Sequence, residues 1–439
     1  MKRLIICRML IGCAVLLVLC SCSTSRQSKF YPIRQLAPDG AWTWYNDERT
    51  IVDGQTLIIG SLDSQGVSRV DLYDMRSGRQ AAYPLSSWKA KDDHNNPALL
   101  KMSNGKILAC YSRHNQQKQW NWRIADSVGK SVYFRLQWGP EQVFKTGANT
   151  TYCNLMQLAD ESNRIYNFSR NIGWNPNIQY SDDMGQTWQG PFQLIKSGDR
   201  STRPYVKYAD NGKDRIDLLY TDGHPRNEPT NSVYHMYYKA GSFYKSDGTL
   251  IKTMAQVKED PMIPTDGTLI YDGTTEGRGW VWDIEYDADS NPVAAFINSA
   301  DHEVGSDLRY RLARFDSKTQ KWQQRQIAFA GTHLYVPENH YAGGITIDPD
   351  NADTVYISTD VDPTTGEPDT TGRYQIFQGK SLDHGRNWNW KQLTFDTAVD
   401  NLRPFVPRDH GRSFCVLWFR GQYNTYKDFK TSIVGIIEK

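Results

Sequence analysis

The residues from Ser181 to Trp188, S-D-D-M-G-Q-T-W, recur as S-L-D-H-G-R-N-W from Ser381 to Trp388. Both copies follow the pattern S-x-D-x-G-x-[TN]-W. The aspartate in this pattern accepts backbone hydrogen bonds in a tight turn, and the glycine supplies a positive φ. The closing tryptophan packs between neighbouring sheets. The repeat therefore predicts two equivalent β-hairpins in a structure built from similar units.

A second repeat accompanies the first. R-P-Y-V, from Arg203 to Val206, follows the first copy at the same distance at which R-P-F-V, from Arg403 to Val406, follows the second. The two segments are therefore expected at equivalent places, with a whole number of units between them. The hairpin motif resembles the Asp-box of sialidase-like β-propellers, where its role is structural. Four-stranded blades of about 40 to 60 residues allow six to eight around a ring.

The rest of the chain is rich in short, β-prone segments bounded by Gly, Asp, Asn or Pro. Examples are Thr56 to Gly60, Val132 to Leu136, Arg215 to Tyr220 and Thr354 to Ser358. Helical periodicity of useful length is absent after the N-terminal segment, and no Gly/Ser-rich or charged linker divides the chain. These features predict an all-β protein whose residues 40–439 form a single propeller domain.

The N-terminus has the features of an export signal. Two basic residues precede an apolar run from Met9 to Leu19, which is too short to span a bilayer as a helix. A Leu-x-Ser-Cys arrangement ending at Cys22 is similar to a bacterial lipoprotein cleavage site. We therefore expect residues 1–22 to be a lipoprotein-type signal peptide with lipidation at Cys22. Cys20 is the alternative site, and residues 23–39 are expected to be a tether.

Such a signal predicts an exported protein, namely an outer-membrane or periplasmic lipoprotein of a Gram-negative bacterium, with the cell surface as a further location. An ordinary cleaved signal without a lipid is the alternative. Contact with the membrane would be made only by the N-terminal lipid. The protein is expected to be a monomer.

Composition excludes several classes of function. The chain has 51 Lys and Arg against 49 Asp and Glu, a formal net charge of +2, and no basic block that would follow a nucleic acid. After the signal only Cys110, Cys153 and Cys415 remain, without the spacing of a disulfide framework or a zinc finger. We expect these three to be small buried apolar side chains.

Several motifs follow one another in order and carry a resemblance to a known family. They are G-A-W-T-W from Gly40, H-N-N-P from His94, Y-N-F-S-R from Tyr166, the first hairpin motif, R-P-Y-V-K-Y from Arg203 and D-G-H-P-R from Asp222. Together they resemble the BNR-4 repeat family, most densely between Trp42 and Tyr238. The resemblance implies a seven-bladed propeller in a group that includes ulvan lyases and enzymes removing rhamnose linked to glucuronate.

The chemistry of a lyase acting on a 4-linked uronate sets out what its site must contain. The enzyme removes the proton on C5 and expels O4, so it needs a base and an acid. It also needs a cation or strong donor on the neighbouring carboxylate, because the C5 proton is only weakly acidic until that charge is neutralised. Arginine binds carboxylates with two hydrogen bonds, histidine titrates near neutrality, and tyrosine beside positive charge exchanges a proton.

The chain supplies such residues around the first hairpin motif. By motif position the resemblance implies the catalytic residues His94, His114, Tyr152 and Arg170. The nearby candidates for substrate contacts are Arg203, Tyr205, His224 and Arg226. We expect His94 to be the proton-abstracting base or its partner, Tyr152 to be the acid or base opposite it, and Arg170 to neutralise the carboxylate. His114 would orient His94 or share its charge. No cofactor is required for this chemistry.

Elimination has two rivals. An α-L-rhamnosidase would use a pair of carboxyl groups, for which Asp47 and Glu48 are the candidates, although Glu48 beside Arg49 is more simply an ion pair. A non-catalytic glycan-binding propeller would show aromatic residues without a titratable set. The predicted substrate is a rhamnosyl-(1→4)-glucuronate linkage, in ulvan or in rhamnose-capped arabinogalactan, and the product is a 4,5-unsaturated uronate.

A second polar and aromatic cluster runs from His333 to Tyr341 and includes Tyr335, Glu338 and His340. It is a candidate to line the same funnel and to bind substrate or a metal. Asp-rich loops are also compatible with a structural Ca²⁺, although the ligand spacing of an EF-hand is absent.

Overall fold

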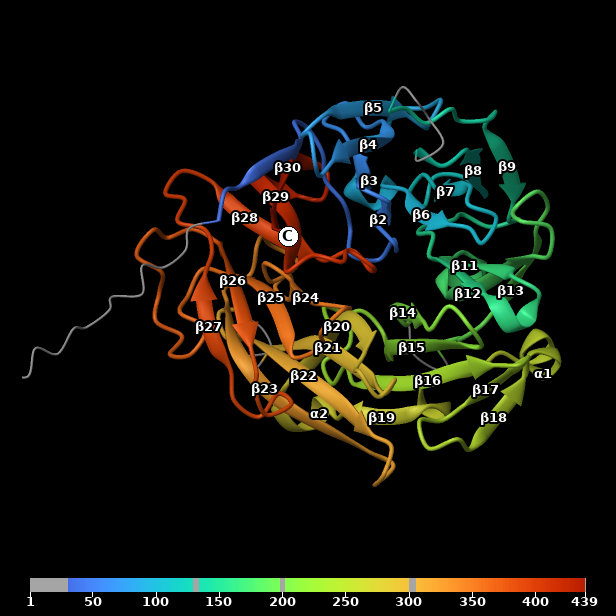
Figure 1. Ribbon diagram of the computed structural model, residues 1–439. Coiled ribbons are helices and arrows are strands. Elements are labelled where there is room, and N and C mark those ends of the chain that lie inside the picture. The colour runs from blue at the N-terminus through green and yellow to red at the C-terminus, as the bar shows by residue number, and fades with distance from the viewer. Residues whose placement is uncertain (1–30, 129–133, 198–201, 300–304, 439) are drawn as a thin grey trace, which may run out of the picture. The chain divides into compact units, whose positions relative to one another are not determined.

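The computed structural model describes residues 31–128, 134–197, 202–299 and 305–438. In these residues the strands form seven antiparallel sheets, which follow one another around a common axis from the blue first blade to the red last one (Figure 1). This is the seven-bladed propeller that the resemblance implies. The expected signal peptide, and with it Cys22, lies outside the described residues.

The sheets are built in chain order, and the first strands of neighbouring blades contact one another, so they lie nearest the axis. Blade 1 comprises β2 (Thr50–Asp53), β3 (Thr56–Leu62), β4 (Ser68–Asp74) and β5 (Gln80–Pro84); blade 2, β6 (Ala98–Lys101), β7 (Ile107–Tyr111), β8 (Gln119–Ala125) and β9 (Gln142–Lys145); blade 3, β10 (Leu155–Leu158), β11 (Arg164–Arg170), β12 (Pro176–Ser181) and β13 (Gln189–Gln193). Blade 5 comprises β20 (Arg278–Tyr286), β21 (Pro292–Ser299), β22 (Leu308–Asp316) and β23 (Lys321–Gly331); blade 6, β24 (Ile345–Ile347), β25 (Thr354–Thr359), β26 (Gln375–Lys380) and β27 (Asn389–Gln392).

Blade 4 has more strands than the four expected. It contains β14 (Val206–Asp210), β15 (Arg215–Thr221), β16 (Val233–Lys239), β17 (Ser242–Tyr244), β18 (Leu250–Thr253) and β19 (Thr268–Tyr271). The end of β16 pairs with β17, whereas its beginning pairs with β19. Two short strands therefore share the outer position that one strand fills in the other blades.

The ring is closed by strands from both ends of the chain. Blade 7 contains β28 (Asp400–Phe405), β29 (Phe414–Thr425) and β30 (Asp428–Glu438), and its outermost strand is the N-terminal β1 (Arg34–Ala37). β1 lies within residues 23–39, for which the sequence suggested a tether. The propeller therefore begins earlier than residue 40, because the hydrogen-bonding edge of β30 is covered by this strand.

The two hairpin motifs have the predicted geometry and occupy equivalent places. They join the third and fourth strands of blades 3 and 6, and the R-P-Y-V and R-P-F-V segments lie at the first strands of the blades that follow. The Asp183 carboxylate accepts the backbone N–H groups of Gln186 and Thr187 at 3.1 and 2.9 Å. Gly185 has φ +79°, and Trp188 packs on Trp120 of blade 2.

Three of the four example strands are confirmed as β3, β15 and β25. The fourth, Val132 to Leu136, is wrong in its described part. Phe134 has φ +51° and the segment from 134 to 136 is irregular, although Phe134 and Leu136 are buried against blades 1 and 2. Its apolar residues signalled burial rather than a strand, since a left-handed residue interrupts the ladder.

Helices are few and short in the described residues. They are α1 (Met254–Glu259), α2 (Gly273–Glu276) and the 3-10 turns Asp93–Asn95, Ala159–Glu161, Ile172–Trp174 and Pro264–Asp266. Within that part of the chain, none has the length and apolar character needed to cross a membrane. Cys110, Cys153 and Cys415 are buried, as predicted.

Candidate active site

The residues selected from the sequence gather at one end of the propeller. In an antiparallel blade the start of the first strand and the end of the second lie at the same edge. His94 and Tyr152 precede the first strands of blades 2 and 3, and Arg170 ends the second strand of blade 3. Tyr205 and His224 occupy the corresponding places in blade 4. Side chains far apart in the sequence therefore reach one cleft.

The eight residues form a continuous chain of contacts. His94 stacks on His114, His114 meets Arg170, and the Arg170 guanidinium lies over the rings of Tyr152 and Tyr205. Tyr205 in turn contacts Arg203 and His224, and the His224 ring accepts the backbone N–H of Arg226. The structure therefore brings all of the sequence-selected residues together.

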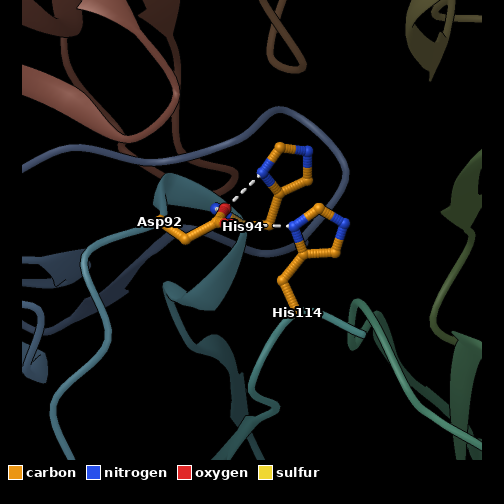
Figure 2. A group of neighbouring side chains, drawn as sticks. All are labelled: Asp92, His94 and His114. Carbon is orange, nitrogen blue, oxygen red and sulfur yellow. Dashed lines mark hydrogen bonds and ion pairs between the residues drawn. The ribbon is translucent and has the colours of Figure 1, made fainter. Parts of the chain in front are cut away.

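Asp92 organises the two histidines (Figure 2). Its carboxylate oxygens lie 2.7 Å from Nδ1 of His94 and 2.8 Å from Nδ1 of His114. The pKa of Asp92 is held well below its usual range by the two imidazoles although burial opposes ionisation, so this carboxylate only accepts, and both Nδ1 atoms donate to it. The two Nε2 atoms point away from Asp92 on the same side.

The two rings differ in charge. Burial disfavours the imidazolium of His94, but Asp92 and Asp93 outweigh burial and raise its pKa to about 9. For His114, burial and the positive charge of His94 lower the pKa to about 4. At neutral pH His94 is therefore a cation with a proton on Nε2, and His114 is neutral with a free lone pair on Nε2. That lone pair faces Nη2 of Arg170 at 3.4 Å.

Backbone bonds hold Tyr152 beside Arg170. The Thr151 N–H donates to the Arg170 carbonyl at 2.9 Å, and the Arg170 N–H donates back to Thr151 at 2.8 Å. Tyr152 itself has φ +67°, a conformation that L-residues rarely adopt. Strained residues of this kind concentrate at functional sites.

Arg170 offers an unused hydrogen-bonding group to the cleft. The residue is buried, with 5% of its surface exposed, and its Nη1 has no hydrogen-bond partner among the described residues. A buried guanidinium nitrogen without a partner is costly, and a bound carboxylate would satisfy it. Tyr152, Arg170 and Tyr205 line a small cavity of about 20 Å³.

The pKa values of the two tyrosines beside Arg170 are shifted in opposite directions. Burial raises the pKa of Tyr152 well above its usual value despite Arg170. For Tyr205, burial is outweighed by the positive charges of Arg170, Arg203 and His94, and its pKa is lowered. Tyr205 therefore loses its proton more readily than an ordinary tyrosine, whereas Tyr152 keeps its own.

Glu338 closes the other side of the cleft. Its carboxylate binds Nη1 of Arg226 at 2.6 Å and lies 3.4 Å from Nε2 of His224. The pKa of His224 is lowered well below its usual value by burial and by Arg226, so the ring is neutral. The cluster from His333 to Tyr341 therefore reaches the site through Glu338, and it braces Arg226 instead of leaving that side chain free.

Asp92, Asp93 and Trp280 belong to the site although the sequence did not single them out. Asp93 is buried and accepts a hydrogen bond from Nη1 of Arg403 at 2.6 Å. Trp280 packs on Tyr205 and His224 with ring centroids 4.8 and 4.7 Å away. The position of Asp92 and Asp93 next to His94 was the one signal that could have identified the acids.

Asp47 and Glu48 do not form a carboxyl pair in this cleft. Asp47 is buried in an ion pair with Lys207 and Arg49. Glu48 lies 3.6 Å from Arg408, which also binds Asp210 at the far end of β14. Both acids are therefore committed to structural pairs away from His94.

The histidine pair and Asp92 form the set of three His, Cys, Asp or Glu residues, within the described ranges, whose ligand atoms lie close enough for a metal. The arrangement fits hydrogen bonding better, because Nδ1 of His94 already serves two carboxylates. Two imidazoles also do not suit Ca²⁺, which takes oxygen ligands. A structural Ca²⁺ stays a prediction.

The fold and the cleft define the class of protein: a seven-bladed propeller with a histidine, arginine and tyrosine network at one end of its blades. The model of the BNR repeat-containing family matches residues 43–330, and the chain belongs to this family. No curated protein matches the sequence.

Two solved structures of an ulvan lyase, from a new family of polysaccharide lyases, have a similar fold. The one bound to -[GlcA(1-4)Rha3S]- gives a TM-score of 0.66 at 13% identity, over 93% of this chain and 96% of that one. The other gives 0.65 with the same identity and coverage. At this identity the likeness shows the fold.

Proposed function

We propose that the protein is a polysaccharide lyase that cleaves rhamnosyl-(1→4)-glucuronate linkages by β-elimination. The observation that carries this proposal is the buried Nη1 of Arg170, which has no hydrogen-bond partner among the described residues. Arg170 lies over the ring of Tyr205, whose pKa is lowered, and contacts His114, which stacks on the imidazolium of His94. A carboxylate binder, a base and an acid are the three groups that elimination from a uronate requires.

In this mechanism Arg170 and the charge of His94 neutralise the uronate carboxylate, which makes the C5 proton more acidic. The Tyr205 phenolate takes that proton. The C5–H electron pair forms the C4=C5 double bond while the C4–O4 bond breaks, and O4 leaves with a proton from Nε2 of His94. We assign the base to Tyr205 rather than to His94 because the pKa of His94, about 9, leaves it protonated at neutral pH.

The remaining residues support these groups. His114 accepts from Arg170 and orients it, and Tyr152 donates a hydrogen bond to the sugar. Arg203 binds an acidic substituent of the chain, and Arg226 contacts the substrate from the position in which Glu338 holds it. The similar ulvan lyase structure holds a fragment with glucuronate linked to a sulfated rhamnose. A substrate of this class, in ulvan or in rhamnose-capped arabinogalactan, supplies the carboxylate that Arg170 lacks.

Hydrolysis is less well supported, because it calls for two carboxyl groups flanking the bond. Asp47 and Glu48 are paired elsewhere, Asp92 is held by both histidines, and Glu338 binds Arg226. A purely binding propeller would not need the opposed pKa shifts of Tyr152 and Tyr205.

The test is the absorbance of the conjugated 4,5-unsaturated uronate during incubation with ulvan and, separately, with rhamnose-capped arabinogalactan. We expect the signal to grow with the wild-type protein and to be lost in Tyr205→Phe. Tyr244→Phe, in the outer part of blade 4, is the matched control and should keep the signal. Free rhamnose without this absorbance would instead establish hydrolysis, and no product with retained binding would establish a binding module.

We also propose that the chain is exported and anchored by a lipid on Cys22. The support is the short apolar run before the Leu-x-Ser-Cys sequence. Detergent phase partition of expressed Cys22→Ser and Cys20→Ser variants tests this. Loss of the detergent-phase form in Cys22→Ser alone is the expected outcome, whereas loss in Cys20→Ser alone would move the lipid to Cys20.

A further inference from the structure

Trp174 lies at the rim of the cleft and takes no part in the proposed elimination. It is the most exposed tryptophan in the described part of the chain, with 41% of its surface accessible. Most of the others are buried between the blades. Exposed indole surface costs free energy in water, so the hydrophobic effect does not explain why this part of Trp174 is left uncovered.

The backbone around Trp174 is tightly organised. The side chain of Asn171 accepts the N–H of Ile172 at 2.6 Å, and the Asn171 carbonyl accepts the N–H of Trp174 at 2.8 Å. Gly173 and Trp174 both have left-handed φ values, of 64° and 62°. This conformation costs a tryptophan about 1 to 2 kcal/mol, so the loop holds the indole in a defined position at an energetic cost.

The indole adjoins the group that is proposed to bind the uronate. The Arg170 guanidinium lies 5.7 Å from the ring centroid of Trp174, and that of Arg203 lies 4.8 Å away. Nη2 of Arg203 also contacts the hydroxyl of Tyr205 at 3.4 Å. Trp174 thus lies beside residues of the cleft, and two of its neighbours, Arg170 and Arg203, are positively charged.

We propose that Trp174 and Arg203 form a flanking subsite for the sugar next to the uronate that is cut. The apolar face of this pyranose ring rests on the part of the indole that Arg170 and Arg203 leave exposed, because its C–H groups meet the aromatic ring there. An acidic substituent of the same sugar, a carboxylate or a sulfate, binds Arg203. This proposal rests on the proposed function and adds the position of the second sugar.

The experiment compares Trp174→Ala, Trp174→Phe and Phe395→Ala on ulvan and on its oligosaccharides of decreasing length. Phe395, 55% exposed and following β27 in blade 6, is the control for loss of an exposed aromatic ring. We expect Trp174→Ala to raise KM on the polymer about three- to ten-fold. This increase in KM should become smaller as the substrate is shortened. Trp174→Phe should have a KM close to that of the wild type, and Phe395→Ala should behave as wild type.

Two results for Trp174→Ala would overturn the subsite. One is an unchanged KM for substrates of every length. The other is an equal fall in kcat for substrates of every length, which would mean that Trp174 only positions Arg170.

Chemically desulfated ulvan identifies the substituent that Arg203 binds. If Arg203→Gln weakens binding of native ulvan but not of desulfated ulvan, Arg203 binds a sulfate. If the substitution weakens binding of both polymers, Arg203 binds a carboxylate. Equal binding in wild type and Arg203→Gln contradicts its role.

Binding separates this proposal from the proposed function. Retardation of the protein in a gel containing ulvan needs no turnover, so it reports on the subsite even if the wild type releases no unsaturated product. In that case the elimination fails, and weaker retardation of Trp174→Ala than of Phe395→Ala still supports the subsite. Equal retardation of the two variants overturns it.

Discussion

The imidazole rings of His94 and His114 stack with centroids 4.1 Å apart and planes inclined by 15°. Both face the same carboxylate, Asp92, yet their pKa values move in opposite directions. Two imidazolium ions at this distance would repel strongly, so the carboxylates stabilise one charge, on His94, and that charge keeps His114 neutral. The pair thereby presents one donor and one acceptor to the cleft.

Activity should depend on pH through His94 and Tyr205. Tyr205 must be ionised, so kcat/KM should rise with pH toward its lowered pKa. His94 must be protonated, so kcat/KM should fall as pH passes about 9. Initial rates of unsaturated uronate formation between pH 5 and 10.5 provide the measurement. A rate that keeps rising to the highest pH would exclude His94 as the acid.

Stability should also depend on the charge of His94. Its folded-state pKa, about 9, lies above the value of about 6.5 in an unfolded chain, so its contribution is complete below pH 6.5 and is lost as pH rises through 9. The contribution is on the order of 3 kcal/mol.

The difference in unfolding free energy between wild type and His94→Gln, measured by urea titration, should therefore shrink between pH 6.5 and pH 10. His384→Gln, whose side chain is 86% exposed, is the control and should show no such trend. A His94→Gln difference that is the same at both pH values would disprove the linkage.

The two Arg-Pro repeats should respond differently to the same substitution. Arg403 is buried and binds Asp93, the carbonyl of Trp42 and the hydroxyl of Tyr423. Arg403→Leu removes the guanidinium from the buried carboxylate of Asp93 and leaves it only His94 and Tyr423 as partners in the described part of the chain, which should cost about 3 to 5 kcal/mol of stability. Arg203→Leu, at the equivalent place in blade 4, should cost less than 1 kcal/mol because Arg203 is partly exposed and makes no ion pair with an acid among the described residues. Chemical denaturation of both variants is the check, and equal losses would contradict this division.

Arg170 should matter for catalysis far more than for stability. Arg170→Lys keeps the charge but loses the second hydrogen bond to a carboxylate, and kcat/KM should fall about 100- to 1000-fold. The melting temperature should change little, because lysine keeps the charge and the polar contact of the guanidinium that is lost is the long one between Nη2 and His114, at 3.4 Å. Arg164→Gln, which breaks a surface pair with Asp182, is the control. Wild-type kinetics in Arg170→Lys would remove Arg170 from the site.

Much of the architecture was predictable from local patterns. The Asp-box signals a turn through its own residues, because Asp183 bonds to N–H groups only three and four positions away. The distance between the repeated motifs then required equivalent blades. In contrast, the prediction of a strand at Val132 to Leu136 was wrong in its described part, since an apolar run indicates burial but not the backbone conformation that achieves it.

The site was predictable in its residues but not in its charges. Motif positions selected His94, His114, Tyr152 and Arg170, and the fold brings them together. Whether His94 is a base or an acid depends on Asp92 and Asp93, and on Arg403 from the last blade, more than 300 positions away in the chain. Similarly, the position of the Arg226 side chain depends on its ion pair with Glu338, which is distant in the sequence.

The sequence by itself thus determined the repeated hairpins, the all-β class and the residue types available for chemistry, because turn geometry and strand propensity are local properties. Only the tertiary structure decided which histidine is charged, which tyrosine has a lowered pKa, and that Nη1 of Arg170 has no hydrogen-bond partner among the described residues. Those properties follow from burial and from Coulomb interactions between groups of different blades, and such distances exist only once the ring has closed.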